Sequence, residues 1–182
     1  MARALAAYQR TLVSGENRIE HFFRTRDGAV LSPLERDGLA IFDTRAGCSG
    51  CHQLAAPNAQ LWDHAPLLLS DFRFHNIGIG YRSGQFTDPG RYAVSRNERD
   101  LGAFRTPSLR NVARTGPYMH DGSLSTLEDV VASYDSGGRP NPNLSPLIRP
   151  LFLSDYERAA LVVFLRALTD GNFVPVGSIS RR

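Results

Sequence analysis

The stretch Ala46-Gly-Cys-Ser-Gly-Cys-His-Gln53 holds two cysteines three positions apart, Cys48 and Cys51, and His52 follows at once. Two thiols at this spacing can each add to one vinyl group of a haem, and the next residue can then present an imidazole to the haem iron. The C-x-x-C-H pattern is therefore the signature of covalent c-type haem attachment. The chain has only two cysteines, both in this motif, so none is left for a disulfide.

Two other uses of a cysteine pair stay open at this point. A thioredoxin-like redox pair usually opens a helix after a strand, whereas the residues before Cys48 are expected to form a helix. A structural zinc site needs four ligands, but no second cysteine pair exists and the remaining histidines lack the H-x3-5-H spacing. The sequence therefore favours c-type haem, with zinc binding and thiol redox chemistry as the alternatives.

The composition limits the class of protein. A length of 182 residues with 42% hydrophobic content suits one domain with a core around a haem, or one domain plus part of a neighbour. No apolar run reaches the length of a transmembrane helix, so no membrane span is expected. The basic residues are all arginines, are scattered along the chain and leave a net charge of only +3. We therefore expect no nucleic-acid partner.

The localisation expected from the motif conflicts with the start of the chain. Bacterial c-type haem is normally attached outside the cytoplasmic membrane, so a periplasmic protein is expected. The N-terminal residues, however, lack the long apolar segment of a signal peptide. We interpret Met1 as an internal start, which would make the chain a fragment of a longer polypeptide.

Apolar spacing and helix-start signals predict an all-α domain with long loops. Residues 2–14 carry apolar side chains at near-helical spacing. Ser32, Thr126 and Ser154 each precede an acidic residue by three positions, which predicts three capped helices. The first of these leads into the C-x-x-C-H motif, as in cytochrome c domains. Residues 53–104 are rich in turn signals, and no strand is expected.

The sixth position of an iron bound by His52 would decide its chemistry. A methionine or histidine there gives an electron-transfer centre, whereas an open position can bind peroxide or oxygen. The candidates are Met119, Tyr134, His75 and His120, and Met119 is the only methionine apart from Met1. From the residues alone the choice stays open.

Two longer runs carry a resemblance to a known family. They are Phe104-Arg-Thr-Pro-Ser-Leu-Arg-Asn-Val-Ala-Arg-Thr-Gly-Pro-Tyr-Met-His-Asp-Gly122 and Ser125-Thr-Leu-Glu-Asp-Val-Val131. They resemble the C-terminal haem domain of the bacterial di-haem cytochrome c peroxidases, and still more the MauG branch. Residues 6–15 and 74–78 match as well. The resemblance implies a cytochrome c-like haem domain at residues 32–182, preceded at 1–31 by a helical segment resembling the end of a neighbouring haem domain.

The resemblance also implies roles for matched positions. His52 would be the proximal ligand of the family's electron-accepting haem. Tyr134 stands at the distal position, which is methionine in the peroxidases and tyrosine in MauG, and Met119 is the alternative. A phenolate ligand favours ferric iron and lowers the reduction potential relative to methionine. Thr115 and Pro117 match positions whose carbonyl oxygens bind a calcium ion between the two haems.

Three further side chains receive weaker assignments. His120 resembles a family histidine that lies near the haems without binding iron. Arg105 and Arg110 are candidates for pairing with haem propionates or for the interface between domains, because the guanidinium group binds carboxylates in a bidentate manner.

The chain departs from the family pattern in one respect. Family members carry two C-x-x-C-H motifs, whereas this sequence has one. The peroxide-binding haem would therefore lie in an N-terminal haem domain. We expect no catalytic residue here and leave the enzymatic activity of this chain open.

The expected function is the electron-transfer half of a di-haem oxidoreductase that uses hydrogen peroxide. It would carry one haem c per chain and act with a second haem domain and a redox partner protein. A mono-haem electron carrier is the alternative, and the sequence leaves a homodimer open.

Overall fold

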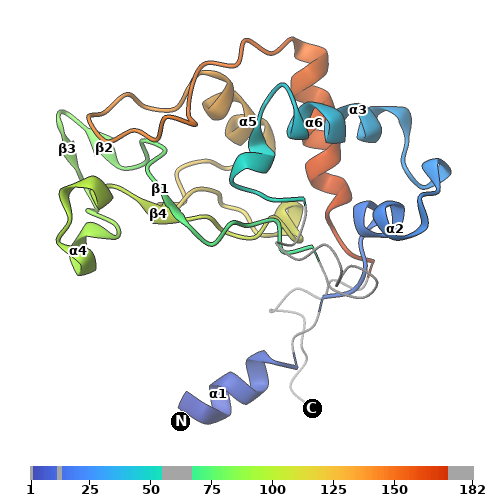
Figure 1. Cartoon of the computed structure of the whole chain (residues 1–182), viewed down its shortest axis with the longest axis horizontal. Coiled ribbons are helices and arrows are strands. Elements are labelled where there is room, and N and C mark those ends of the chain that lie inside the picture. The colour runs from blue at the N-terminus through green and yellow to red at the C-terminus, as the bar shows by residue number, and fades with distance from the viewer. Residues whose placement is uncertain (1, 12–13, 55–66, 172–182) are drawn as a thin grey trace.

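The computed structural model describes residues 2–11, 14–54 and 67–171 (Figure 1). These residues form helices joined by long loops, and the expected all-α class is confirmed. Two small antiparallel strand pairs, β1 with β4 and β2 with β3, lie in the loop-rich middle and were not predicted. The elements are α1 (Ala2–Gln9), α2 (Arg18–Thr25), η1 (Gly28–Val30), α3 (Pro33–Asp43), η2 (Cys48–Gly50), β1 (Phe74–His75), β2 (Tyr81–Arg82), β3 (Gln85–Phe86), α4 (Tyr92–Ser95), η4 (Glu98–Asp100), β4 (Phe104–Arg105), η5 (Val112–Arg114), α5 (Leu127–Asp135) and α6 (Asp155–Ala167).

Side-chain caps set the starts of the main helices. The capping boxes predicted at Ser32, Thr126 and Ser154 are all formed. In the first, the Glu35 N–H donates to Ser32 Oγ at 3.3 Å, and the Ser32 N–H donates to Glu35 Oε2 at 2.7 Å. A fourth box begins α2 at Asn17, where the same spacing of signals was overlooked. Each cap contributes about 1 kcal/mol by satisfying amide groups that the helix leaves unpaired.

The first two helices differ in how they pack. α1 ends at Gln9, short of the predicted residue 14, and residues 12 and 13 lie outside the described ranges. It buries no residue and stands off from the rest of the chain in Figure 1. α2, by contrast, buries Ile19 completely in the main hydrophobic core. The predicted boundary after residue 31, between a segment of a neighbouring domain and the haem domain, stays a prediction.

The scaffold of the fold is the crossing of α3 and α6, which is visible in Figure 1. The rings of Phe42 and Phe164 meet there with their centroids 4.8 Å apart. Gly38 allows the close approach, because a Cβ at this position would overlap the carbonyl oxygen of Ala160 and lie 2.7 Å from the Cβ of Phe164. α5 packs beside α6 and contributes Leu127 and other apolar residues to the same core. Within the described ranges, no helix combines the length and apolar character needed to cross a bilayer.

We predict that Gly38→Ala destabilises the fold by about 1–3 kcal/mol, the usual cost of overpacking a dense contact. Alanine is the better helix former, so a loss of stability would come from the helix crossing and not from helix propensity. Urea unfolding followed by circular dichroism measures it. Gly28→Ala is the control, because its nearest neighbour would be Arg36 Nη1 at 3.6 Å. Equal stability of the two variants would contradict the close contact.

Candidate functional site

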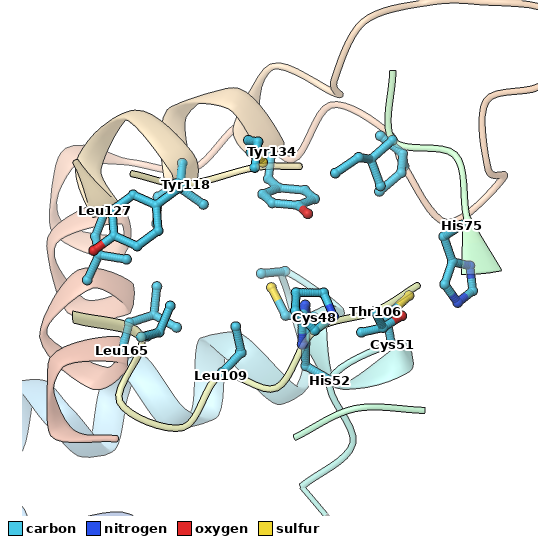
Figure 2. Close-up of a pocket in the computed structure, with 18 of the residues that line it drawn as sticks. Cys48, Cys51, His52, His75, Thr106, Leu109, Tyr118, Leu127, Tyr134 and Leu165 are labelled. Carbon is cyan, nitrogen blue, oxygen red and sulfur yellow. The ribbon is translucent and has the colours of Figure 1, made fainter. Parts of the chain in front are cut away.

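A largely apolar cavity of about 630 Å³ lies between α5, α6 and the turn that carries the cysteines (Figure 2). Its size falls in the range of small-molecule and cofactor sites. Leu127 and Val131 of α5 and Leu161 and Leu165 of α6 line it, together with Phe42 of α3. The scaffold helices that form the core therefore also supply the walls of the cavity.

A tight turn places the three motif residues on one wall. Gly47 adopts a left-handed conformation with φ 64°, which glycine tolerates without strain, and it directly precedes the short helix η2 that carries Cys48. The Cys48 carbonyl then accepts N–H groups from both Cys51, at 3.2 Å, and His52, at 2.9 Å. Cys48, Cys51 and His52 all line the cavity as a result. The grouping predicted from their spacing is present.

The imidazole of His52 is oriented by a backbone carbonyl. Its Nδ1 lies 2.9 Å from the Leu69 oxygen, which can only accept, so Nδ1 carries the proton. Burial lowers the pKa of His52 and keeps the ring neutral. Nε2 therefore retains the lone pair that a metal needs. Leu69 is almost fully buried and has a left-handed φ of 51°, a conformation that costs a leucine about 1–2 kcal/mol.

Burial keeps the two free thiols protonated. It raises the pKa of Cys48 to about 12. For Cys51, burial and the nearby charge of Asp71 raise the pKa as well. Both thiols are free. They face an apolar space, which is the setting that a covalently attached, largely apolar ligand requires.

Tyr134 of α5 occupies the opposite wall. Figure 2 shows its phenol facing Cys48 and His52 across the cavity. Burial raises the pKa of Tyr134, so the free phenol is protonated. Met119 also lines the cavity and has a left-handed φ of 68°. Tyr134 and Met119 thus border the same space as His52, as the distal-ligand prediction requires.

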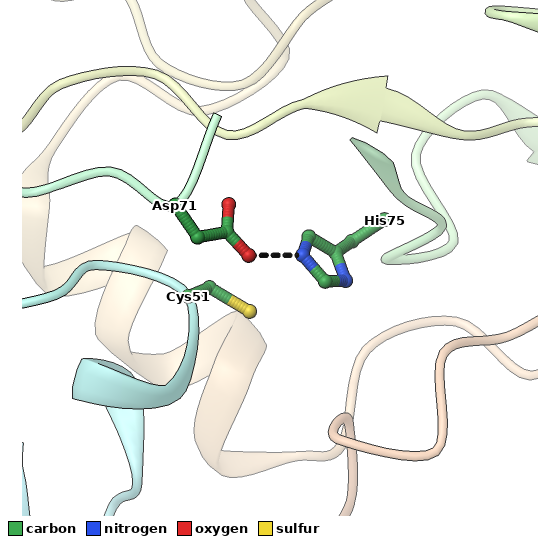
Figure 3. A group of neighbouring side chains, drawn as sticks. All are labelled: Cys51, Asp71 and His75. Atoms are coloured by element: carbon green, nitrogen blue, oxygen red, sulfur yellow. Dashed lines mark hydrogen bonds and ion pairs between the residues drawn. The ribbon is translucent and has the colours of Figure 1, made fainter. Parts of the chain in front are cut away.

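The two remaining candidates for the distal ligand, His75 and His120, are each held by a carboxylate. His75 Nε2 lies 2.8 Å from Asp71 Oδ2, and the pair sits beside Cys51 (Figure 3). His120 Nε2 lies 3.0 Å from Asp88 Oδ2, and its ring stacks on Phe104 at 3.9 Å between centroids. His75 and His120 line the cavity, but each has one ring nitrogen engaged in this way.

The arginines divide between the cavity and the core. Arg105 lines the cavity, and its guanidinium lies 5.0 Å from the ring centroid of Phe72. Arg110 forms a nearly buried ion pair with Glu20 of α2 instead, so the structure does not support a propionate-pairing role for it. Arg149 lines the cavity as well and was missed, because a lone arginine in a loop carries no sequence signal. The role of the Leu69 carbonyl was missed because a backbone group carries no sequence signal.

Comparison with known proteins finds relatives that are named as cytochrome c peroxidases or MauG proteins. A cytochrome c peroxidase of Denitromonas iodatirespirans is 37% identical over 195 residues, covering 91% of this chain and 48% of the relative. The MauG protein of Methylorubrum extorquens is 38% identical over 165 residues, covering 91% and 42%. The crystal structure of a MauG-like protein associated with microbial copper homeostasis superimposes with a TM-score of 0.75 at 32% identity, covering 92% of this chain and 55% of that one. No protein-family model matches.

These relatives and the fold define the class. The chain belongs to the family of di-haem cytochrome c peroxidases and MauG proteins, and it corresponds to one haem domain of them. It spans about half the length of the curated relatives it matches. The family binds c-type haem.

We predict that the two thiols of the haem-free chain differ in reactivity. Cys48 should be alkylated by iodoacetamide at pH 8 more slowly than Cys51, because only thiolates react and burial raises the pKa of Cys48 to about 12. Mass spectrometry of Cys48→Ala and Cys51→Ala isolates each remaining thiol, and circular dichroism checks that both variants are folded. Equal rates in folded protein would contradict the deeper burial of Cys48.

Proposed function

We propose that this chain is a c-type haem domain that transfers electrons within a di-haem oxidoreductase acting on hydrogen peroxide. The observation that carries the proposal is the arrangement of Cys48, Cys51 and His52 on one wall of an apolar cavity, opposite the phenol of Tyr134. Relatives named as peroxidases and as MauG align with about nine tenths of the chain.

The residues present fit a haem. The cavity is large and apolar, as a porphyrin requires, and two thiols with an adjacent imidazole border it. Cys48 and Cys51 would hold the group through thioether bonds, and His52 Nε2 would bind the iron. The Leu69 carbonyl holds the histidine ring in its orientation through Nδ1. Haem iron, when bound, supplies one-electron transfer between the ferric and ferrous states.

Tyr134 is the distal ligand we propose, with Met119 as the alternative. The phenol already faces His52 across the cavity and lies on α5, whose start is fixed by the Thr126 cap. Because burial raises the pKa of Tyr134, its Oη would give up a proton on binding iron. An anionic oxygen ligand favours the ferric state, which suits a domain that works at low potential.

Charged and carbonyl groups complete the proposed site. Arg105 and Arg149 line the cavity and are the arginines we assign to the haem propionates. Thr115 and Pro117 line it as well, and their carbonyl oxygens are hard donors suited to calcium. A calcium ion at these carbonyls stays a proposal, in which the remaining ligands come from outside the chain.

The partners follow from the same reasoning. We propose that a second haem domain reacts with peroxide, that a redox partner protein exchanges electrons with it, and that the protein works in the periplasm, where c-type haem is attached. A homodimer stays a prediction.

One observation favours a second candidate. The 182 residues contain a single C-x-x-C-H motif, which is what a mono-haem electron carrier without catalysis would have. Sequencing of the coding region upstream distinguishes the two. A further C-x-x-C-H there supports the di-haem oxidoreductase, whereas its absence supports the carrier.

We predict that the chain, exported together with a c-type haem maturation system, keeps its haem after denaturation and acid–acetone extraction. Two thioether bonds survive conditions that remove a haem held by axial ligands alone. Haem staining of a denaturing gel and intact mass measure this. Cys48→Ala and Cys51→Ala should each retain at most one thioether, and the double variant should release the haem. A folded wild-type chain without covalent haem would contradict the proposal.

A further inference from the structure

A nearly buried ion pair joins α2 to the loop below the cavity. Glu20 of α2 pairs with Arg110 Nη1, and both side chains are about nine-tenths buried. Neither residue lines the cavity. Arg110 Nη2 also donates to the Gly15 carbonyl at 2.7 Å, so the pair is tied to the segment before α2 as well. A buried pair with so many partners has one fixed geometry.

The pair holds both backbone groups of one residue. The Leu67 N–H donates to Glu20 Oε1 at 2.7 Å, and Arg110 Nη1 donates to the Leu67 carbonyl at 3.3 Å. Leu67 is itself buried. Two residues further on lies Leu69, whose carbonyl accepts a hydrogen bond from His52 Nδ1.

The far side of this short segment is pinned separately. Ser70 Oγ donates to the Thr106 carbonyl at 2.8 Å, and the Asp71 N–H donates to the Cys51 carbonyl at 2.8 Å. Leu69 therefore lies between two anchors in a left-handed conformation that leucine rarely adopts. Releasing one anchor allows the segment to relax toward ordinary φ values and to turn the carbonyl away from His52.

We propose that Glu20 and Arg110 are positioning residues for His52, which tune the haem iron by fixing the Leu69 carbonyl. This inference rests on the proposed function. A hydrogen bond from Nδ1 raises the basicity of a metal-bound imidazole. A more basic ligand stabilises ferric iron, so the intact pair keeps the reduction potential low. Loosening it weakens the bond and raises the potential.

The test is spectroelectrochemical titration of the haem-loaded chain. Glu20→Gln keeps an acceptor for Leu67 and a suitable capping residue but loses the charge. Arg110→Lys keeps the charge but, as a point-like ammonium, cannot reproduce the fork of contacts. Both variants should shift the ferric-to-ferrous equilibrium toward ferrous iron by up to tenfold. For one electron, this is a rise of up to about 59 mV in the reduction potential. Glu20→Ala, which removes the acceptor as well, should shift it further than Glu20→Gln.

Arg18→Gln is the matched control. Arg18 lies on the same helix, but it pairs with Glu35 at 2.8 Å and donates to the Val30 carbonyl, so its polar contacts tie α2 to α3 and η1. It should leave the potential and the ferric electron paramagnetic resonance spectrum unchanged, even though it removes an ion pair from α2.

The outcomes separate this inference from the proposed function. Haem-bound, folded Glu20 and Arg110 variants with the wild-type potential would overturn the positioning role while leaving the haem site intact. An equal shift in Arg18→Gln would also overturn it, because general loosening of α2 would then be the cause. A wild-type chain that binds no haem would overturn the proposed function instead.

Discussion

The hydrogen bond from His52 Nδ1 to the Leu69 carbonyl is the interaction on which the candidate site depends. It fixes the tautomer of the imidazole and leaves Nε2 with the free lone pair that a metal needs. The segment that supplies the carbonyl belongs to no helix or strand, so its geometry depends on its hydrogen-bonded anchors and on the burial of Leu67 and Leu69 in the core. Those anchors come from α2, from the motif turn and from the loop next to β4, which are distant in sequence.

The helical scaffold serves the cavity in a complementary way. α3 and α6 can approach closely only because Gly38 lacks a side chain. Their crossing delivers the chain at Gly47 into the motif turn on one wall, while α5, packed beside α6, presents Tyr134 on the other. The walls are largely apolar, and an apolar surrounding would strengthen the electrostatic effect of a ligand on iron bound there. The same helix contacts thus stabilise the fold and shape the candidate site.

Local signals explain what the sequence predicted. The three capping boxes and the C-x-x-C-H turn each depend on residues within four positions of one another, so their geometry could be foreseen. The partner of Arg110 could not be foreseen, because Glu20 lies ninety residues away in the sequence and also takes part in the cap of its own helix. The sequence therefore left Arg110 as a candidate for haem propionates or for the interface between domains, and its ion pair with Glu20 does not support the first of these. The roles of Leu69, Asp71 and Arg149 likewise depend on tertiary contacts, and the two-residue strands are too short to leave a periodic pattern.

In the proposed haem site, the residue opposite His52 would decide between a low-potential, MauG-like centre and a plain electron carrier. The most direct measurement is the resonance Raman spectrum of the ferric, haem-loaded chain, compared with Tyr134→Phe and Met119→Leu. We predict iron-bound tyrosinate ring modes in the wild type that persist in Met119→Leu and vanish in Tyr134→Phe. Spectra without these modes, or a ligand change on replacing Met119 alone, would contradict the site as described.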